Sequence, residues 1–542
     1  MPMDALRQIL GNRSILRVEL GWLVAIAAEW AYLVAALVYA YDVGGVAAVG
    51  LASTLRMLPA AFIGPLMTAI SDRFSPGPVL VGTHVGQGLL VGLVGLGIVV
   101  GASPVLVLTG ILLEGIIATL ERPTTMAALP ALARSPQELV ASNAAISSGE
   151  AVGTLLGPTI GGILIGVAGP GPTVIATAGA FGVAGLLVLR LEARRPVDPD
   201  HDATDRSAVR ELLAGFGALR SHPPAGLLVA LFSAQTFVRG VLTVLIVAVS
   251  VELLGLGQSG VGYLTSAIGA GGLVGAILAF GLVGRRNLAS VVSLALAAWG
   301  LPILLLGLAP VPLLAFGFMA TIGVANATLD VSGLSLLQRI VPNRVRGRLF
   351  GAFESIVTLT MGIGSLVAPL VVAAVGLTNA LIVAGAILPV LALMTASSVR
   401  RADAAAVVPQ RQLDLLRGIP MFSPLTMTTV ERIAGGLVEE QHPSGVEVIH
   451  QGDAGDSWYL VADGAVDVAR DGRHVRQLGV GEGFGEIALL SNRPRTATVI
   501  TAASTTLYRL PRPVFLEAVT GNPHAIQAGE DLVRERLAAQ GH

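Results

Sequence analysis

Long apolar segments recur through most of this chain, and they limit its possible folds more than any other feature. A helix needs about 20 apolar residues to cross a bilayer, and we count roughly twelve segments of that length. They lie near 19–41, 46–70, 78–100, 104–126, 142–168, 172–190, 225–250, 260–283, 288–308, 312–336, 349–375 and 378–398. Because lipid offers no hydrogen bonds to an open backbone, the sequence predicts a mostly α membrane protein.

Arginines in the connecting loops predict how these helices cross the membrane. They occur ahead of the first segment and then in every second loop, as at Arg73, Arg134, Arg285 and Arg400. The loops between, near 42–45, 101–103, 169–171, 251–259, 309–311 and 376–377, contain none. Because positively charged loops stay in the cytoplasm, we expect an even number of spans and cytoplasmic N- and C-termini. We expect a multi-pass protein of the plasma membrane, with the lipid bilayer as a partner.

Breaks in the apolar pattern divide the chain into five regions. An N-terminal half of six helices at 1–190 precedes a cytoplasmic linker at 191–224 and a second six-helix half at 225–400. A short linker at 401–409 leads to a polar region at 410–542, where β-branched residues alternate with Gly-bearing turns between 446 and 510. The predicted fold is twelve transmembrane helices in two six-helix halves, followed by a small cytosolic β-roll domain with flanking helices.

Other function classes are disfavoured by features that the sequence lacks. The chain has no cysteine, which excludes disulfides, thiolate metal sites and cysteine nucleophiles. No Walker phosphate loop, metalloprotease motif or nucleophile elbow occurs, and His84 has no histidine or carboxylate at metal-ligand spacing. The net charge of −1 gives no reason to expect a nucleic-acid partner. We therefore expect no enzyme, no metal and no cofactor acting as a catalyst.

The run FGEIALLSNRPRTATV at 484–499 carries the most explicit chemistry in the sequence. Gly485 lets the backbone approach a ligand closely, and the adjacent Glu486 can accept a hydrogen bond from a sugar hydroxyl. Arg495 offers a fixed fork of donors that matches a phosphate. Together these residues predict a site for an anionic ligand that carries a ribose.

This run resembles the phosphate-binding cassette of the cyclic nucleotide-binding domain family, and the resemblance extends over roughly 410–538. It implies that Glu486 binds the ribose 2′-hydroxyl and Arg495 the cyclic phosphate, in a cassette completed by Gly485, Ile487, Ala488, Thr496 and Ala497. The regulatory ligand would be cAMP or cGMP, which Thr496 does not distinguish. The final helix would cover the base, with Ile526, Leu532 and Arg536 as candidates. A cassette that has lost nucleotide binding is the alternative.

A stripe of small residues marks the fifth apolar segment, at Gly153, Gly157, Pro158, Gly161 and Gly162. Small residues at this spacing permit close helix packing in lipid, and that structural role is sufficient to explain them. The run also resembles the antiporter motif of major facilitator superfamily exporters, except that Ala144 stands where the family has an upstream glycine. The resemblance covers roughly 14–400 when the two six-helix halves are included.

The loop after the second segment, from Gly64 to Ser75, resembles the cytoplasmic gating motif of the same superfamily, although Thr68 and Ser75 depart from it. The resemblance implies that Asp72, next to Arg73, lies at the start of span eleven, where helix N-terminal donors favour a carboxylate. Arg122 would be its partner. The alternative is a solvated pair of loop charges.

Four charged residues lie near the middle of apolar segments, namely Glu29, Arg56, Glu114 and Arg239. Charges are costly inside a bilayer and are usually paired or functional. One interpretation makes them interhelix ion pairs without a role in transport. The other makes Glu29 or Glu114 a proton carrier whose affinity for the proton changes as an arginine approaches.

Three functional hypotheses follow. The first is a proton-coupled secondary active transporter that exports small amphiphilic molecules and is regulated by a cyclic nucleotide on its cytosolic C-terminal domain. The second is a membrane sensor or receptor that does not transport. The third gives the C-terminal domain only a docking or dimerisation role, so that the protein forms a homodimer through it.

Overall fold

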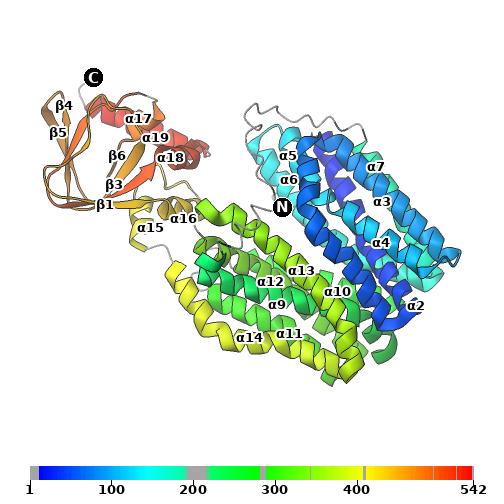
Figure 1. Cartoon of the computed structure of the whole chain (residues 1–542). Coiled ribbons are helices and arrows are strands. Elements are labelled where there is room, and N and C mark those ends of the chain that lie inside the picture. Colours follow the sequence, from blue (N-terminus) through cyan, green and yellow to red (C-terminus); the bar gives the residue numbers. More distant parts are fainter. Residues whose placement is uncertain are drawn as a thin grey trace. The chain divides into compact units, whose positions relative to one another are not determined.

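The computed structural model describes residues 11–189, 191, 217, 219–280, 288–341, 343–406, 410–425, 427–491, 493–520 and 522–539. The chain divides into two compact units, Met1–Ala405 and Ala406–His542, which are described separately (Figure 1). The division falls inside the linker expected at 401–409. The other expected linker, at 191–224, lies largely outside the described residues, and the five-region organisation stays a prediction.

The first unit is built from long apolar helices. In its N-terminal half these are α2 (Arg13–Arg73), α3 (Pro76–Val99), α4 (Pro104–Ala118), α5 (Glu121–Leu132), α6 (Pro136–Ala168) and α7 (Pro170–Val188). In its C-terminal half they are α9 (Pro223–Ala248) with the π-helix η2 (Val249–Leu253), α10 (Ser259–Phe280), α11 (Leu288–Leu308), α12 (Pro312–Ile340), α13 (Asn343–Val375) and α14 (Leu377–Ala406). Proline opens many of them because its missing N–H is not needed in the first turn.

Among the described residues, eleven helices are long and apolar enough to cross a membrane. The first of them, Arg13–Ile63, contains a break at Gly44 and Gly45, where Gly45 takes a positive φ of 57° that favours glycine. This helix is therefore two helices joined at the loop expected near 42–45. The mostly helical class with a small β domain is confirmed, whereas the number of twelve spans stays a prediction.

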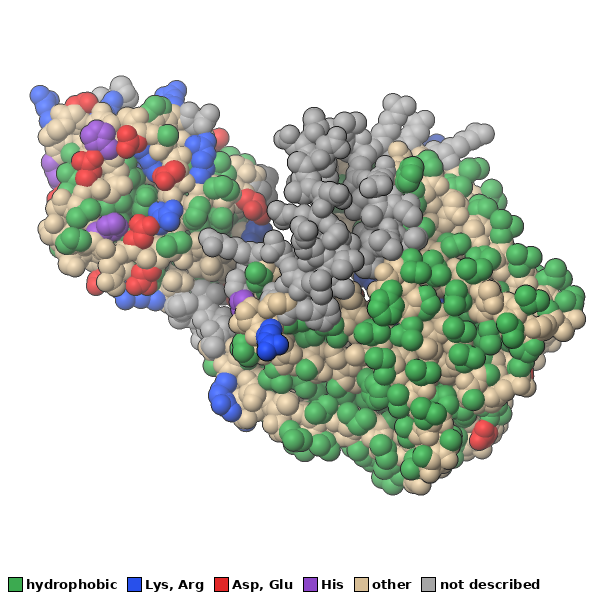
Figure 2. Space-filling model, in the orientation of Figure 1, with side chains coloured by type: hydrophobic (Ala, Val, Ile, Leu, Met, Phe, Trp, Pro, Cys, Tyr) green, Lys and Arg blue, Asp and Glu red, His purple; other side chains and the backbone are tan. Residues whose placement is uncertain are grey.

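The surface of the helical unit is apolar over a wide area. Leu93, Leu106, Leu313 and Leu393 are all exposed large side chains on its helices. Figure 2 shows the hydrophobic side chains spread across this unit and the charged ones gathered on the C-terminal domain. An apolar exterior of this extent is what contact with lipid tails requires.

Small residues bring the two halves of the helical unit together. A Cβ added at Gly50 on α2 would lie 2.4 Å from Pro369 on α13, and one at Gly240 on α9 would lie 2.0 Å from the Met361 carbonyl. Backbones can approach this closely because glycine has no side chain. The packing interface between the halves is thus made by backbone-to-backbone approach.

Polar side chains also join the halves at the ends of these helices. The Tyr41 hydroxyl donates a hydrogen bond to Glu252, and Gln258 Nε2 donates to the Asp42 carboxylate at 2.7 and 2.9 Å. We call these two pairs the inter-half contact. They link the break in α2 to η2 and to the turn after η2. The break and the turn lie in two of the loops that contain no arginine.

The second unit is a β-roll flanked by helices. Its helices are α15 (Gln410–Arg417), α16 (Met427–Gly435), α17 (Glu486–Leu490), α18 (Arg512–Thr520) and α19 (Pro523–Ala539). Its strands are β1 (Val438–His442), β2 (Glu447–Ile449), β3 (Ser457–Asp463), β4 (Val466–Arg470), β5 (Arg473–Leu478), β6 (Gly483–Phe484), β7 (Thr498–Thr501) and β8 (Thr505–Pro511). They form two antiparallel sheets, β1-β8-β3-β6 and β2-β7-β4-β5.

The core of this unit has two parts. Apolar side chains from both sheets, among them Val461, Val499 and Leu507, fill the inside of the roll. On the other side of β3, the Trp458 ring packs against Phe422 and Phe515 and anchors the helices. β3 is buried on both of its faces, and because successive strand residues face opposite sides, Val461 points into the roll while Trp458 points toward the helices.

Candidate functional site

The turn from β6 into α17 positions Glu486. Gly485 adopts a φ of 93°, a left-handed conformation that side chains disfavour, and α17 begins directly after it. A Cβ at Gly485 would also lie 2.6 Å from Arg495 Nη1. The turn therefore needs glycine for its backbone conformation and for the close approach of the arginine.

Arg495 is held in place almost entirely by neutral oxygens. It is 5% exposed, and it donates from Nη1 to the Gly485 carbonyl at 3.0 Å and from Nη2 to the Ser457 carbonyl at 2.7 Å. Its charged partner is Asp456, 3.1 Å from Nη2, whose side chain is 76% exposed. Since an exposed carboxylate is screened by water, much of the guanidinium charge is left for an anionic ligand.

Glu486 has one satisfied oxygen and one that awaits a donor. The residue is 1% exposed, and its Oε1 pairs with Arg536 Nη1 on α19 at 2.6 Å. Arg536 Nη1 also donates to the Gly483 carbonyl at 2.8 Å. The second oxygen, Oε2, is buried without a hydrogen-bond partner, which a sugar hydroxyl could supply.

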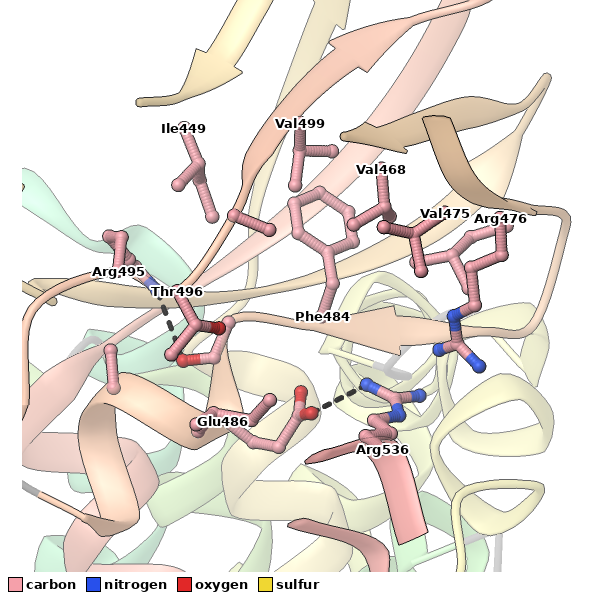
Figure 3. Close-up of a pocket in the computed structure, with 15 residues that line it drawn as sticks. Ile449, Val468, Val475, Arg476, Phe484, Glu486, Arg495, Thr496, Val499 and Arg536 are labelled. Carbon is pink, nitrogen blue, oxygen red and sulfur yellow. Dashed lines mark hydrogen bonds and ion pairs between the residues drawn. The ribbon is translucent and has the colours of Figure 1, made fainter. Parts of the chain in front are cut away.

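These side chains line one pocket, in which charged groups meet an apolar wall (Figure 3). The apolar wall comes from Ile449, Val468, Val475, Phe484 and Val499. The pKa of Arg476 in the same pocket is lowered by burial and by the nearby Arg536 guanidinium. Two crowded cations favour a bound anion, and the apolar wall suits an aromatic base.

The structure brings the whole predicted cassette to this pocket. Its lining includes Gly485, Glu486, Ile487, Ala488, Arg495, Thr496 and Ala497. Of the residues expected to cover the base, Arg536 lines the pocket and Leu532 lines a neighbouring cavity of about 250 Å³, whereas Ile526 packs against the domain core. The pairing of Arg536 with Glu486 was not expected, because the two are far apart in the sequence.

A second assembly of charges lies inside the N-terminal helical half. Arg56 on α2 places Nη2 2.5 Å from Glu29 Oε1 and Nε 3.1 Å from Glu114 Oε2 on α4. Glu114 is fully buried, whereas the Glu29 side chain is 24% exposed. The break in α2 allows Glu29 and Arg56, on the two arms of one helix, to meet.

Arg239 does not belong to this assembly. It lies on α9 in the C-terminal half, where Asp330 of α12 is its electrostatic neighbour. Asp330 also accepts a hydrogen bond from Asn326 Nδ2 at 2.9 Å. The interpretation as interhelix ion pairs therefore fits Glu29, Arg56 and Glu114, whereas Arg239 lies in the other half and has Asp330 beside it.

The small residues of α6 pack against two helices. A Cβ at Gly153, Gly157 or Gly161 would lie 2.5 to 3.0 Å from atoms of Ile26, Ala27 or Ala31 on α2. On the other side, Gly162 and the Pro158 carbonyl approach Gly262 on α10 of the C-terminal half. The small residues of α6 therefore contact α2 within the N-terminal half and α10 across the interface between the halves.

The residues of the proposed gating motif are only partly described. Arg122 lies in the first turn of α5, and its Nη1 is 3.5 Å from Glu150 Oε1 on α6, with the Arg122 side chain 69% exposed. The side chains of Asp72 and Arg73 lie outside the described residues. Their expected interaction with Arg122 stays a prediction.

Comparison with known families assigns both parts of the chain. Residues 20–288 match the Major Facilitator Superfamily, and residues 439–522 match the cyclic nucleotide-binding domain. Both family resemblances are thereby confirmed over these residues, whereas the antiporter and gating motifs and the extension to residue 400 stay predictions. The second match includes every residue of the predicted cassette.

The relatives and solved structures named next each cover about a fifth of this chain. A cAMP-dependent protein kinase regulatory subunit of Yarrowia lipolytica is 36% identical over 104 residues, 19% of this chain and 28% of that protein. A cGMP-dependent protein kinase of Toxoplasma gondii is 36% identical over 107 residues, 20% of this chain and 11% of that protein. The Thermus thermophilus catabolite activator protein structure is 31% identical, with a TM-score of 0.21, and covers 22% of this chain and 58% of that one. The chain thus spans less than a third of either kinase protein.

Proposed function

We propose that this chain, which joins a Major Facilitator Superfamily domain to a cyclic nucleotide-binding domain, is a secondary active transporter regulated by a cyclic nucleotide. It exports small amphiphilic molecules in exchange for protons. It lies in the plasma membrane with both termini in the cytosol, so that the C-terminal domain meets the cytosolic nucleotide. This proposal rests on one observation. Arg495 and Glu486 line the same pocket, in a chain that also carries membrane helices.

The ligand of the C-terminal domain is cAMP or cGMP. Arg495 binds the cyclic phosphate, because its buried charge is countered only by neutral carbonyls and one exposed carboxylate. Glu486 accepts the ribose 2′-hydroxyl at its unpartnered oxygen. The relatives named for cAMP-dependent and cGMP-dependent kinases support a cyclic nucleotide without choosing between the two.

The transport step uses the two helical halves. The glycine-rich packing between them permits one half to rock against the other, as in transporters built from repeated halves. The carboxylates paired with Arg56 exchange protons as the halves move. Glu29, whose side chain is 24% exposed, is the member of this cluster through which protons enter and leave.

Regulation requires the nucleotide to favour one arrangement of the halves. A ligand with equal affinity for both arrangements shifts nothing, so binding must differ between them. The path is short, because α14 ends at Ala406 and α15 begins at Gln410. The nucleotide-binding domain therefore follows the last membrane helix closely in the sequence, and we expect α14 to be the helix that responds to nucleotide.

Proteoliposome flux tests the proposal. Full-length protein is reconstituted, a panel of amphiphilic fluorescent dyes is placed on one side, and a pH gradient is imposed with or without cAMP or cGMP on the face of the C-terminal domain. We expect gradient-dependent dye movement whose rate changes with nucleotide, and no nucleotide effect in Arg495→Ala. Binding of nucleotide with unchanged flux would reject regulation, and the absence of flux for every dye would favour the non-transporting sensor.

A further inference from the structure

A third buried carboxylate extends the cluster around Arg56. Glu121, at the first position of α5, is 3% exposed, and its Oε2 accepts a hydrogen bond from Gln87 Nε2 at 3.3 Å. Gln87 is fully buried on α3, and Glu114 and His84 lie beside its amide. Glu121 therefore shares one electrostatic environment with Glu29, Glu114 and Arg56.

Within the described part of the chain, several polar atoms around this amide have no hydrogen-bond partner. They are Glu114 Oε1, Glu121 Oε1, Gln87 Oε1 and His84 Nδ1, all in side chains at least nine-tenths buried. Native proteins leave few buried polar atoms unsatisfied, because each one costs about 1–3 kcal/mol. Two of these atoms are carboxylate oxygens, and a proton on either carboxyl group would supply a donor where these oxygens have none.

The charge balance leads to the same conclusion. Within the described residues of this cluster, three carboxylates face one guanidinium, so full ionisation would leave two negative charges in an apolar surrounding. Buried carboxylates without a counter-charge take up protons, and neighbouring carboxylates do not readily ionise together. At least one carboxyl group of the cluster is therefore protonated.

The contacts distinguish Glu121 from the other two carboxylates. Arg56 pairs directly with Glu29 and Glu114, whereas the hydrogen bond of Glu121 comes from the neutral Gln87 amide. His84 is 2% exposed, and a buried imidazole without a carboxylate partner among the described residues favours the neutral form. The Tyr32 hydroxyl, buried near Glu114, is neutral as well.

We propose that Glu121 is a proton-binding site of the membrane half, held protonated by its burial beside Gln87 while Glu114 stays ionised against Arg56. The chemical step is the uptake of one proton from water by the Glu121 carboxylate and its later return to water, and no other bond forms or breaks. The inference rests on the proposed function in one respect: in a transporter this proton would be the one exchanged against substrate.

Infrared difference spectroscopy of the full-length protein in lipid nanodiscs tests the site without any transport substrate. Spectra are recorded as the buffer is stepped from neutral to alkaline pH. We expect a C=O stretching band of a buried, protonated carboxyl group at neutral pH, which shifts in D2O and disappears on deprotonation. In Glu121→Gln this band is missing, and in Glu121→Asp, which keeps the carboxyl group, it moves in frequency.

Matched variants identify the origin of the band. Glu150→Gln removes a partly exposed carboxylate of α6 and should leave the band unchanged, and Gln87→Leu should shift it because a hydrogen bond to the carboxyl group is lost. A band that is identical in the wild type, Glu121→Gln and Glu121→Asp overturns the proposal. So does a wild-type spectrum without such a band.

The spectra and the flux experiment fail independently. A Glu121 band in a protein that moves no dye rejects the transporter but keeps the proton site. Dye movement driven by a pH gradient in a protein whose spectra show no Glu121 contribution keeps the transporter and assigns the proton to another residue.

Discussion

Two buried arginines in this protein are compensated in opposite ways. Arg56 in the membrane half lies between two carboxylates, with a third nearby, so its charge is more than cancelled. Arg495 in the C-terminal domain is bound by carbonyls and by one exposed carboxylate, so its charge is available. Burial alone therefore does not show that an arginine binds a ligand. The charge of its partners shows it, because an arginine bound mainly by neutral groups can still attract an anion.

The largest effect is expected at Arg56. Arg56→Met keeps most of the side-chain volume but leaves the fully buried Glu114 and the partly exposed Glu29 without their cation, and breaking a buried pair in this way costs about 3–5 kcal/mol. Thermal and denaturant unfolding of the purified full-length protein should show a loss of this size. Arg122→Met, which breaks an exposed pair, is the control and should cost about 1 kcal/mol or less. Equal losses in the two variants would contradict the assigned burial.

The next effect concerns ligand binding at Arg495. Arg495→Ala removes the donors for the cyclic phosphate, and truncating one partner of a buried charge pair costs about 2–5 kcal/mol. Calorimetry with cAMP and cGMP on the full-length protein should show an affinity at least about 30-fold weaker. The exposed neighbour Arg493 gives the matched control, because Arg493→Ala removes the same charge from the surface. Native affinity in Arg495→Ala would mean that the phosphate binds elsewhere.

A smaller effect is expected from the turn that precedes Glu486. Gly485→Ala forces a side chain into a left-handed conformation, which costs about 1–3 kcal/mol, and it presses against Arg495. Nucleotide affinity and the unfolding temperature of the domain should both fall. Gly479→Ala serves as the control, since no atom lies within 4 Å of its added Cβ. A variant at Gly485 that binds like the Gly479 control would show that the turn is not restrictive.

The smallest effect tests the comparison most directly. Asp456→Asn removes the only carboxylate that pairs with Arg495 among the described residues, and because that carboxylate is exposed the stability change should stay below about 1 kcal/mol. Nucleotide affinity should rise slightly, since a competing anion is gone. If instead the domain loses as much stability as Arg56→Met, then both arginines depend on their carboxylates and the contrast between them fails.

The nucleotide cassette could be predicted because its chemistry is local. Gly485, Glu486 and Arg495 lie within one short stretch, and their residue types alone indicate a phosphate and a ribose. The partner of Glu486 could not be found in this way. Arg536 reaches it from the last helix, and only the packing of α19 against the roll brings the two together.

For the charged residues of the membrane half, the sequence identifies the residues but not their partners. Glu29, Arg56 and Glu114 could be identified one by one from the cost of burying a charge, but their pairing depends on how α2 and α4 pack. Arg239 was identified by the same cost, but its neighbour Asp330 also depends on helix packing, here of α9 and α12. Glu121 was overlooked because it lies beside Arg122 at the end of an expected span, a position that suggests solvent.

The inter-half contact also offers a way to follow this molecule in motion. Asp42 and Gln258 belong to different halves and are joined here by hydrogen bonds, so their separation reports whether that side is shut. The natural sequence has no cysteine. A pair of cysteines at these two positions would therefore be labelled selectively with spin probes, and the distance distribution between the probes would measure directly how nucleotide redistributes the conformations.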